Sequence, residues 1–299
     1  MRVVVSVGGN ALLKRGEAMT ASAQRANAME AACALASVLA HHEVLITHGN
    51  GPQVGLLALQ AQSDKSLPAY PFDILGAESQ AMVGYILLEA LQKAMPSRRF
   101  VNLVTRTLVD QADPAFDKPT KFIGPVYEKE QALELAKLCH WHVLPDGRYW
   151  RRVVASPAPC EVLELEAIES LMQAGFTVIA AGGGGVPVVR EGKGFRGVEA
   201  VIDKDLTASL LAQALHAERF VIATDVDAVY ENFDELEHRP IGRICASELE
   251  KGLFPAGSMG PKVKAACEFV KRTGRCAAIG ALGDIAGLIE LKAGTVIEP

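Results

Sequence analysis

Short apolar runs alternate with longer helix-like segments along most of this chain of 299 residues. The runs are rich in β-branched side chains and end in turn residues, which is typical of buried strands. They cover residues 2–7, 44–47, 100–105, 177–181, 220–224 and 277–280. The helix-like segments cover about residues 21–41, 52–62, 75–95, 162–174, 204–217 and 261–273. This alternation predicts an α/β fold with a mainly parallel sheet covered by helices on both faces.

One region, residues 123–159, departs from this alternation and is called the insert below. It is rich in charged and aromatic side chains, as in the stretch YEKEQALELAKLCHWHVLPDGRYWRR. The pattern predicts a short helix followed by a hairpin around Asp146 and Gly147. We interpret the insert as a protruding subdomain or lid, and an ordinary surface excursion is the alternative.

Composition and charge narrow the class of protein. Apolar residues make up 49% of the chain and the formal net charge is −5, which argues against a nucleic-acid partner. No stretch approaches about 18 uncharged apolar residues and no signal peptide is readable, so we expect no membrane span. The six cysteines lack a C-x-x-C pair, which favours reduced thiols in the cytoplasm. The stretch 139–142 (CHWH) has no second ligand cluster, so we predict no metal site there.

Three glycine clusters each follow a predicted strand: residues 8–10 (GGN), 48–51 (HGNG) and 182–185 (GGGG). The carboxyl ends of parallel strands meet at one edge of a sheet, where open α/β folds bind their ligands. No cluster opens a helix with G-x-G-x-x-G, and the sequence contains no P-loop or protein-kinase signature. Backbone N–H groups with asparagine amides can surround phosphate oxygens, so we favour a phosphate or small-anion site. The alternative for each cluster is a tight turn without a ligand.

Lysines lie close to several predicted turns and helix starts. Lys204 stands between Asp203, which can cap the helix, and Asp205, so it projects from a positive helix end. Lys262 follows two glycines at another helix start, and two more lysines lie on the proline-rich loop before the insert. Cations at such places can offset the charge of a transferring phosphoryl group. For Lys204, the alternative is a surface capping pattern.

Acidic residues follow the predicted strand 220–224. Asp225 and Asp227 can hold Mg²⁺ or a ribose, and Tyr230 can border a base. An aspartate pair after a strand also caps turns, and the spacing does not choose between these roles.

Nine segments, in this order, resemble the carbamate kinases, which are members of the amino-acid-kinase fold family. The segments are VGGNALL, THGNGPQVG, ESQAMVGYIL, DPAFDKPTKFIGPVY, WRRVVASPAP, GGGGVPV, GVEAVIDKDL, TDVDAVYENF and GSMGPKV. The similarity extends from Val3 to about Asp284, which is nearly the whole chain.

This resemblance implies one domain over residues 1–299, an open three-layer αβα sandwich with a mainly parallel sheet of about eight strands. It implies reversible phosphoryl transfer between ATP, used with Mg²⁺, and carbamate, giving ADP and carbamoyl phosphate. The N-terminal part would bind the acceptor, the part from about residue 205 the nucleotide, and the insert would protrude over the acceptor site. The resemblance also implies a homodimer.

The same resemblance assigns roles to residues of this sequence. Gly8, Gly9 and Asn10 would contact the transferring phosphoryl group, and Gly49, Asn50 and Gly51 would hold the carbamoyl side. Lys121 would reach in from the hinge of the insert, Lys204 and Lys262 would neutralise the transition state, and Asp205 would orient those lysines. The predicted nucleotide-binding residues are Gly183, Gly184, Asp225, Tyr230, Met259 and Lys262.

Two positions depart from the family pattern. Ala81 stands where glycine is common, on a helix expected near the dimer contact, and Lys264 stands where an acidic residue is common. Neither position is a predicted catalytic one. Because the fold family phosphorylates several acceptors, a kinase for another small carboxylate or phosphonate is the first alternative. A catalytically silent nucleotide-binding regulator is the second, and the intact lysines argue against it. The instability of carbamate in water favours the ATP-forming direction in a degradative pathway such as arginine breakdown.

Overall fold

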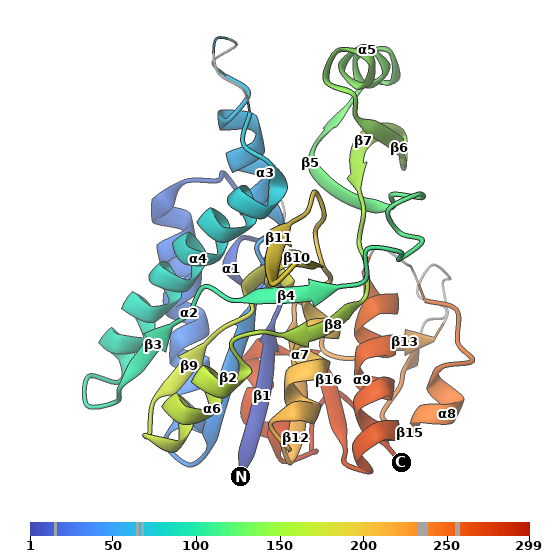
Figure 1. The fold of residues 1–299 in the computed structure, drawn as a ribbon. Helices are drawn as coiled ribbons and strands as arrows, with labels where there is room; N and C mark the ends of the chain where they lie inside the picture. The colour runs from blue at the N-terminus through green and yellow to red at the C-terminus, as the bar shows by residue number, and fades with distance from the viewer. Residues whose placement is uncertain (15–16, 64–65, 67–68, 232–238, 255–257) are drawn as a thin grey trace.

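The fold is built on an eight-stranded sheet (Figure 1). It is known from a computed structural model that describes residues 1–299 except 15–16, 64–65, 67–68, 232–238 and 255–257, and except the side chains of residues 10 and 11. The strand order is β15-β17-β16-β12-β1-β2-β9-β3. In chain order these strands are β1 (Arg2–Val7), β2 (Glu43–His48), β3 (Phe100–Asn102), β9 (Thr177–Ile179), β12 (Arg219–Thr224), β15 (Arg243–Cys245), β16 (Ala277–Ala281) and β17 (Thr295–Glu298).

The sheet is parallel except for one pair, β16 and β17. The central strand β1 pairs with β2 on one side and with β12 on the other. The carboxyl ends of these three strands therefore meet at one edge of the sheet. The predicted mainly parallel sheet of about eight strands is confirmed.

Helices cover both faces of this sheet, which makes three layers. Alternate residues of β1 point to opposite faces. Val3, Val5 and Val7 join the core under one helix layer, and Val4 joins the core under the other. The first layer contains α2 (Ala21–Leu39), α4 (Phe72–Ala94) and α10 (Ile285–Ile289), and the second contains α6 (Leu165–Gln173), α7 (Lys204–Ala214), α8 (Ala246–Leu249) and α9 (Met259–Thr273).

Helix α4 is long and apolar enough to cross a membrane, judged by length and composition alone. Half of its apolar window is buried inside the protein, and the helix packs against α2. Val83, Leu87 and Leu91 belong to the core on that face. The composition of α4 is therefore explained by its place in a layered domain.

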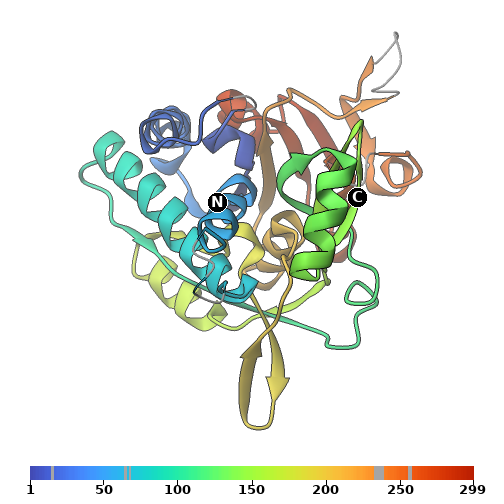
Figure 2. The same cartoon turned by 90° about the horizontal axis from the view of Figure 1, so that it is seen from above.

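Short elements surround the sheet at its carboxyl edge. The turns after β1 and β2 lead into α1 (Gly9–Leu12) and α3 (Gly51–Gln60), and the turn after β9 contains the short 3₁₀ helix η1 (Gly182–Gly184). A second sheet has the order β11-β10-β4-β8. Its strands are β4 (Arg106–Val109), β8 (Pro159–Val162), β10 (Val186–Glu191) and β11 (Gly194–Gly197). Figure 2 shows the β10–β11 hairpin extending away from the body of the molecule. The remaining short elements are β13 (Tyr230–Glu231), β14 (Arg239–Pro240) and the 3₁₀ helix η2 (Leu282–Asp284).

The insert contains a small antiparallel sheet of order β5-β7-β6 and one helix. Strand β5 (Lys121–Tyr127) begins just before it, and α5 (Lys129–Cys139), β6 (His142–Asp146) and β7 (Tyr149–Val154) follow. The expected helix and hairpin are both present, and the turn lies between Asp146 and Tyr149. In Figure 1 this unit stands at the end of the molecule opposite the two chain termini. The insert therefore lies on the same side as the glycine turns.

Candidate active site

The turns that follow β1 and β2 are in direct backbone contact. Gly8 N–H donates to the Ala223 carbonyl at 2.8 Å, and Gly49 N–H donates to the Val7 carbonyl at 3.0 Å. A Cβ atom added to Gly49 would lie 2.6 Å from the Gly9 nitrogen and 3.4 Å from Lys204 Cε. Because real Cβ atoms do not approach a backbone so closely, glycine at position 49 is required by this approach. Gly51 begins α3 and has open space around it.

The third glycine cluster is buried against the second. Gly183 has a φ of +64°, and a Cβ atom there would lie 2.1 Å from Asn50 Nδ2. Gly184 has a φ of +95° and would place a Cβ atom 2.8 Å from the Ile202 carbonyl oxygen. Asn50 itself donates from Nδ2 to Ser79 Oγ at 2.7 Å. The cluster 182–185 thus supports the shape of the Asn50 turn, with backbone conformations that favour glycine.

Asp205 joins two lysines from different helices. Its Oδ1 accepts from Lys204 Nζ at 2.6 Å, and its Oδ2 accepts from Lys262 Nζ at 2.9 Å. Ser6, the fifth residue of β1, donates to Asp205 Oδ1 at 2.7 Å and accepts from Lys204 Nζ at 2.7 Å. The sequence could not show that Lys204 and Lys262 converge, and the structure places both on one carboxylate beside the glycine turns.

The electrostatics of this group follow from its burial. Asp205 is 2% exposed. Burial alone would raise the pKa of Asp205, but the Lys204 and Lys262 ammonium groups more than offset that effect and hold the pKa well below its usual range. Burial lowers the pKa of Lys204, which also lies near the Lys262 charge. Burial acts against the charge of Lys262 as well, but Asp205 raises the pKa of that lysine above its ordinary value.

Lys121 and Asp203 form the next ion pair outward. Lys121 Nζ donates to Asp203 Oδ2 at 2.7 Å, and the two side chains are 34% and 13% exposed. Asp203 also caps α7, because its Oδ1 accepts from the Asp205 backbone N–H at 3.0 Å. The expected capping role of Asp203 is therefore confirmed.

His48 is fully buried at the end of β2, between the turn and Gly182. Its Nδ1 lies 3.1 Å from the Gly49 carbonyl oxygen, and a Cβ atom on Gly182 would lie 2.3 Å from His48 Cε1. Burial lowers the pKa of His48 to about 4, and the nearby Lys204 charge acts in the same direction. The imidazole is therefore neutral at physiological pH and adds no charge to the site.

The residues predicted for the nucleotide follow β12 and begin α9. Asp225 is exposed, accepts from Thr224 Oγ1 at 3.0 Å, and raises the pKa of Lys262 through space. Tyr230 donates its hydroxyl to Asp227 Oδ1 at 2.8 Å. Met259 is the first residue of α9 and packs at the border of the core. The Asn10 side chain lies outside the described part of the structure.

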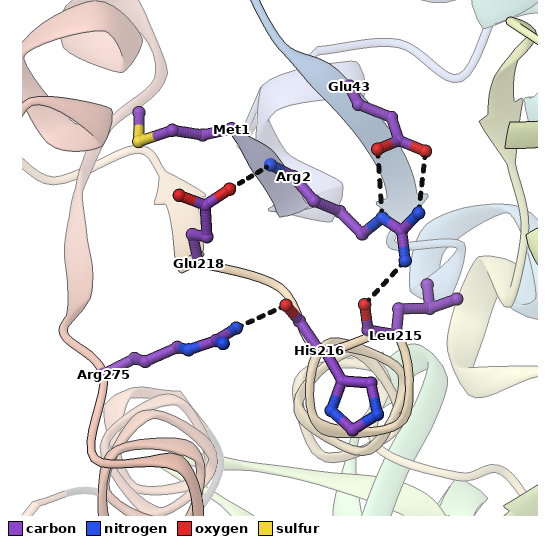
Figure 3. A pocket seen from close by; sticks show the side chains of 7 residues that line it. All are labelled: Met1, Arg2, Glu43, Leu215, His216, Glu218 and Arg275. Atoms are coloured by element: carbon purple, nitrogen blue, oxygen red, sulfur yellow. Dashed lines mark hydrogen bonds and ion pairs between the residues drawn. The ribbon is translucent and has the colours of Figure 1, made fainter. Parts of the chain in front are cut away.

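A separate depression lies at the opposite edge of the main sheet (Figure 3). Arg2 and Glu43, from the amino ends of β1 and β2, line it together with Arg275. Arg2 donates to both carboxylate oxygens of Glu43, and Arg275 donates to the His216 carbonyl. The charged side chains of Arg2 and Arg275 are thus already bonded to other parts of the protein. We therefore place the candidate site at the carboxyl edge of the sheet and not in this depression.

Sequence reasoning missed two contributors to the site, Ser6 and His48. Ser6 is a lone hydroxyl inside the apolar run VVVSV, and this departure from an apolar strand is the signal that could have identified it. His48 was noted only as part of the HGNG turn. The residue Asp203 was recognised as a cap, but its pairing with Lys121 depends on a contact across 82 positions of the chain.

Comparison with known proteins identifies the family of this chain. The model of the amino acid kinase family matches residues 1–280. The chain therefore belongs to the amino acid kinase family.

Curated relatives narrow the family further. A carbamate kinase of Rhizobium meliloti (strain 1021) is 50% identical, over 100% of this chain and 93% of the relative. A carbamate kinase of Escherichia coli (strain K12) is 48% identical, over 99% of both chains. The solved structure of carbamate kinase from Giardia lamblia bound to AMP-PNP has a TM-score of 0.91 at 39% identity, and covers 99% of this chain and 98% of that one. Within the family, the chain groups with the carbamate kinases.

Proposed function

We propose that this protein catalyses reversible phosphoryl transfer between carbamoyl phosphate and ADP, forming carbamate and ATP. The observation that carries the proposal is the arrangement of Lys204 and Lys262 on Asp205, beside the contact between the Gly8–Gly9 and Gly49–Gly51 turns. The similarity to carbamate kinases over the full chain supports the same conclusion.

The chemistry needs positive charge in a fixed place. In the ATP-forming direction, a β-phosphate oxygen of ADP attacks phosphorus, and the bond from phosphorus to the carbamoyl oxygen breaks as carbamate leaves. Charge spreads over the oxygens of the phosphoryl group in between. Lys204 and Lys262 are already oriented by Asp205, so they can stabilise that charge with little rearrangement. The attacking phosphate oxygen is anionic, so the step requires no general base.

The acceptor side and the nucleotide side are proposed from the roles that the resemblance to the carbamate kinases implies. We assign the phosphoryl group to Gly8, Gly9 and Asn10, and the carbamoyl end to Gly49, Asn50 and Gly51. The nucleotide is assigned to Asp225, Tyr230, Met259 and Lys262. Gly183 and Gly184, which are buried beside Asn50 and Ile202, are also proposed as nucleotide-binding residues.

Magnesium is expected to arrive with the nucleotide. The described residues contain no group of three or more His, Cys, Asp or Glu side chains that could hold a metal ion. Mg²⁺ usually keeps several waters and binds substrate phosphates with one or two carboxylates. The exposed carboxylate of Asp225 fits that minimal requirement, and bound Mg²⁺ would supply further charge neutralisation at the phosphates.

A coupled assay tests the proposal directly. Purified protein receives carbamoyl phosphate and MgADP, and ATP formation is followed against a blank without protein. Carbamoyl phosphate decomposes in water, so the blank sets the background. We expect protein-dependent ATP formation, and no ATP above the blank would remove the proposal. Faster turnover in the ATP-forming direction than in the reverse would support a role in a degradative pathway such as arginine breakdown.

The two alternative functions have their own measurements. A panel of small carboxylates and phosphonates offered with ATP would reveal another acceptor. Calorimetric titration that shows ADP binding, with no turnover on any acceptor, would indicate a regulator. The intact Lys204, Asp205 and Lys262 group argues against the second alternative, because a silent protein has no need of two lysines on one buried carboxylate.

The assembly is proposed to be a cytoplasmic homodimer formed through α4. Ile74, Ala81 and Tyr85 lie on the exposed side of that helix at helical spacing, with side chains of Ile74 and Tyr85 among the exposed large apolar groups. Apolar side chains gathered on one helix face are typical of a partner contact.

A further inference from the structure

Residues 200–203, which precede α7, contact both ends of the unit formed by β5 and the insert. Val201 N–H donates to the Ala155 carbonyl at 3.0 Å, and Ala155 forms a parallel bridge with Ala200. At the other end, Lys121 pairs across the small sheet with Val154 and reaches Asp203 with its side chain. A movement of the insert relative to the sheet therefore acts on residues 200–203.

Asp203 uses its two oxygens for two different tasks. Oδ1 accepts from the Asp205 backbone N–H and caps α7, whereas Oδ2 accepts from Lys121 Nζ. The next residue is Lys204 and the one after is Asp205, which holds Lys204 and Lys262. The charge of Asp203 also acts on Lys204 and Lys262 through space. The Asp203 carboxylate thus contacts both Lys121, at the hinge of the insert, and the backbone of Asp205, which holds Lys204 and Lys262.

We propose that Asp203 is a positioning residue, which holds Lys121 toward the reacting phosphoryl group and links the insert to α7. This inference rests on the proposed function. A lysine that is 34% exposed has many rotamers available, and ordering it at the moment of reaction costs conformational entropy. The ion pair with Asp203 keeps the Lys121 ammonium group beside the start of α7, next to the residue that precedes Lys204, before substrate arrives.

Two substitutions separate this role from helix capping. Asp203→Asn keeps an oxygen for the Asp205 N–H, because asparagine caps helices as well as aspartate does, but it removes the charge that holds Lys121. Asp203→Ala removes both the capping oxygen and the charge that holds Lys121. A positioning role predicts that both variants lose roughly tenfold in kcat/KM and that only Asp203→Ala also unfolds at lower temperature. Normal activity in Asp203→Asn would mean that Asp203 is only a cap.

A double-mutant cycle with Lys121→Ala completes the test. If Asp203 acts through Lys121, Asp203→Asn changes kcat/KM by less than about twofold in the Lys121→Ala background. If the double variant loses kcat/KM by the product of the two single-variant factors, the two residues act independently and the inference is overturned. Glu161→Gln, which removes an exposed ion pair with Arg190, is the matched control and should leave kcat/KM unchanged. Absence of ATP formation by the unmutated protein would instead overturn the proposed function, and this inference with it.

Discussion

A single carboxylate, that of Asp205, holds the two lysines on which the proposed chemistry depends. The group contains two ammonium charges and one carboxylate, so it has an excess positive charge that favours the binding of an anion. Ser6 adds a neutral hydrogen-bonding partner to the same oxygen that Lys204 uses. Removing one partner from a buried ion pair costs more than the pair itself contributes, because the remaining charge stays buried.

We expect Asp205→Asn to destabilise the protein by about 3–5 kcal/mol at pH 7, as loss of a buried charge partner does. The folded-state pKa of Asp205 lies below its value of about 3.8 in the unfolded chain. The stability that its charge contributes is therefore present above pH 4 and is lost as the pH falls below it.

Urea unfolding of both proteins between pH 7 and pH 3 measures this difference. The gap between the wild type and Asp205→Asn should narrow below about pH 4. Glu161→Gln, on the exposed pair with Arg190, should change stability by less than about 1 kcal/mol. A gap that stays the same at every pH would contradict the assigned charge state of Asp205.

The two lysines should act mainly on the transition state. Lys204→Ala and Lys262→Ala are each expected to lower kcat by about 100-fold or more, which corresponds to roughly 3 kcal/mol. Lys264→Ala is the control, since Lys264 lies two positions away on α9 with an exposed side chain. Steady-state kinetics measures kcat for each variant, and thermal unfolding measures whether its stability has changed. A Lys204→Ala protein with near-normal kcat and only a lower melting temperature would make Lys204 a structural residue.

At the scale of elements, the insert contacts the main body through a narrow base. Ile123 and Val154 pack against Val54, Ala58 and Phe72 in a small core of their own. Arg152 lies between the rings of Phe72, from the body, and Trp141, from the insert. Only one residue of α5, Ala132, is buried. A unit with so few buried contacts opens locally more easily than the central sheet does.

We therefore predict that the insert closes over the acceptor site when substrates bind. Closure would exclude water that hydrolyses carbamoyl phosphate and would hold Lys121 at the phosphoryl group. Hydrogen exchange with and without carbamoyl phosphate plus ADP measures it, and slower exchange in residues 123–159 is expected with ligands. Unchanged exchange there, together with full activity of Lys121→Ala, would make the insert a fixed surface feature.

Sequence reasoning found the elements with long apolar patterns and missed the short ones. The helices α2, α4, α7 and α9 and the central strands lie where periodicity placed them, within a few residues. The hairpin β10–β11 was missed because β11 is short and mostly exposed, so it leaves no apolar run. Likewise, the predicted strand 100–105 ends at Asn102, and β4 starts a second sheet at Arg106. Contacts such as that of Ser6 with Lys204 depend on topology, which no local pattern records.

At the scale of the whole molecule, the exposed face of α4 is expected to form the dimer contact. Tyr85→Glu would place a carboxylate in that contact and should shift the protein toward monomer, since burying a charge at an apolar interface is costly. Sedimentation at a series of concentrations measures the shift. Leu138→Glu, at an exposed site on α5, is the control and should leave assembly unchanged. A protein that is monomeric before mutation would contradict the homodimer.

The position of β1 has a consequence for synthesis of the chain. This strand lies between β2 and β12, and its residues Val3–Val7 bond to residues 219–223 along one edge. That edge stays unpaired until most of the chain has left the ribosome, and an unpaired apolar edge is a template for association with other chains. A chain cut short before β12 would therefore leave one edge of β1, its most apolar strand, without a partner, and we expect it to aggregate. Deletion of β15 alone, at the outer edge of the sheet, would leave β1 paired on both sides.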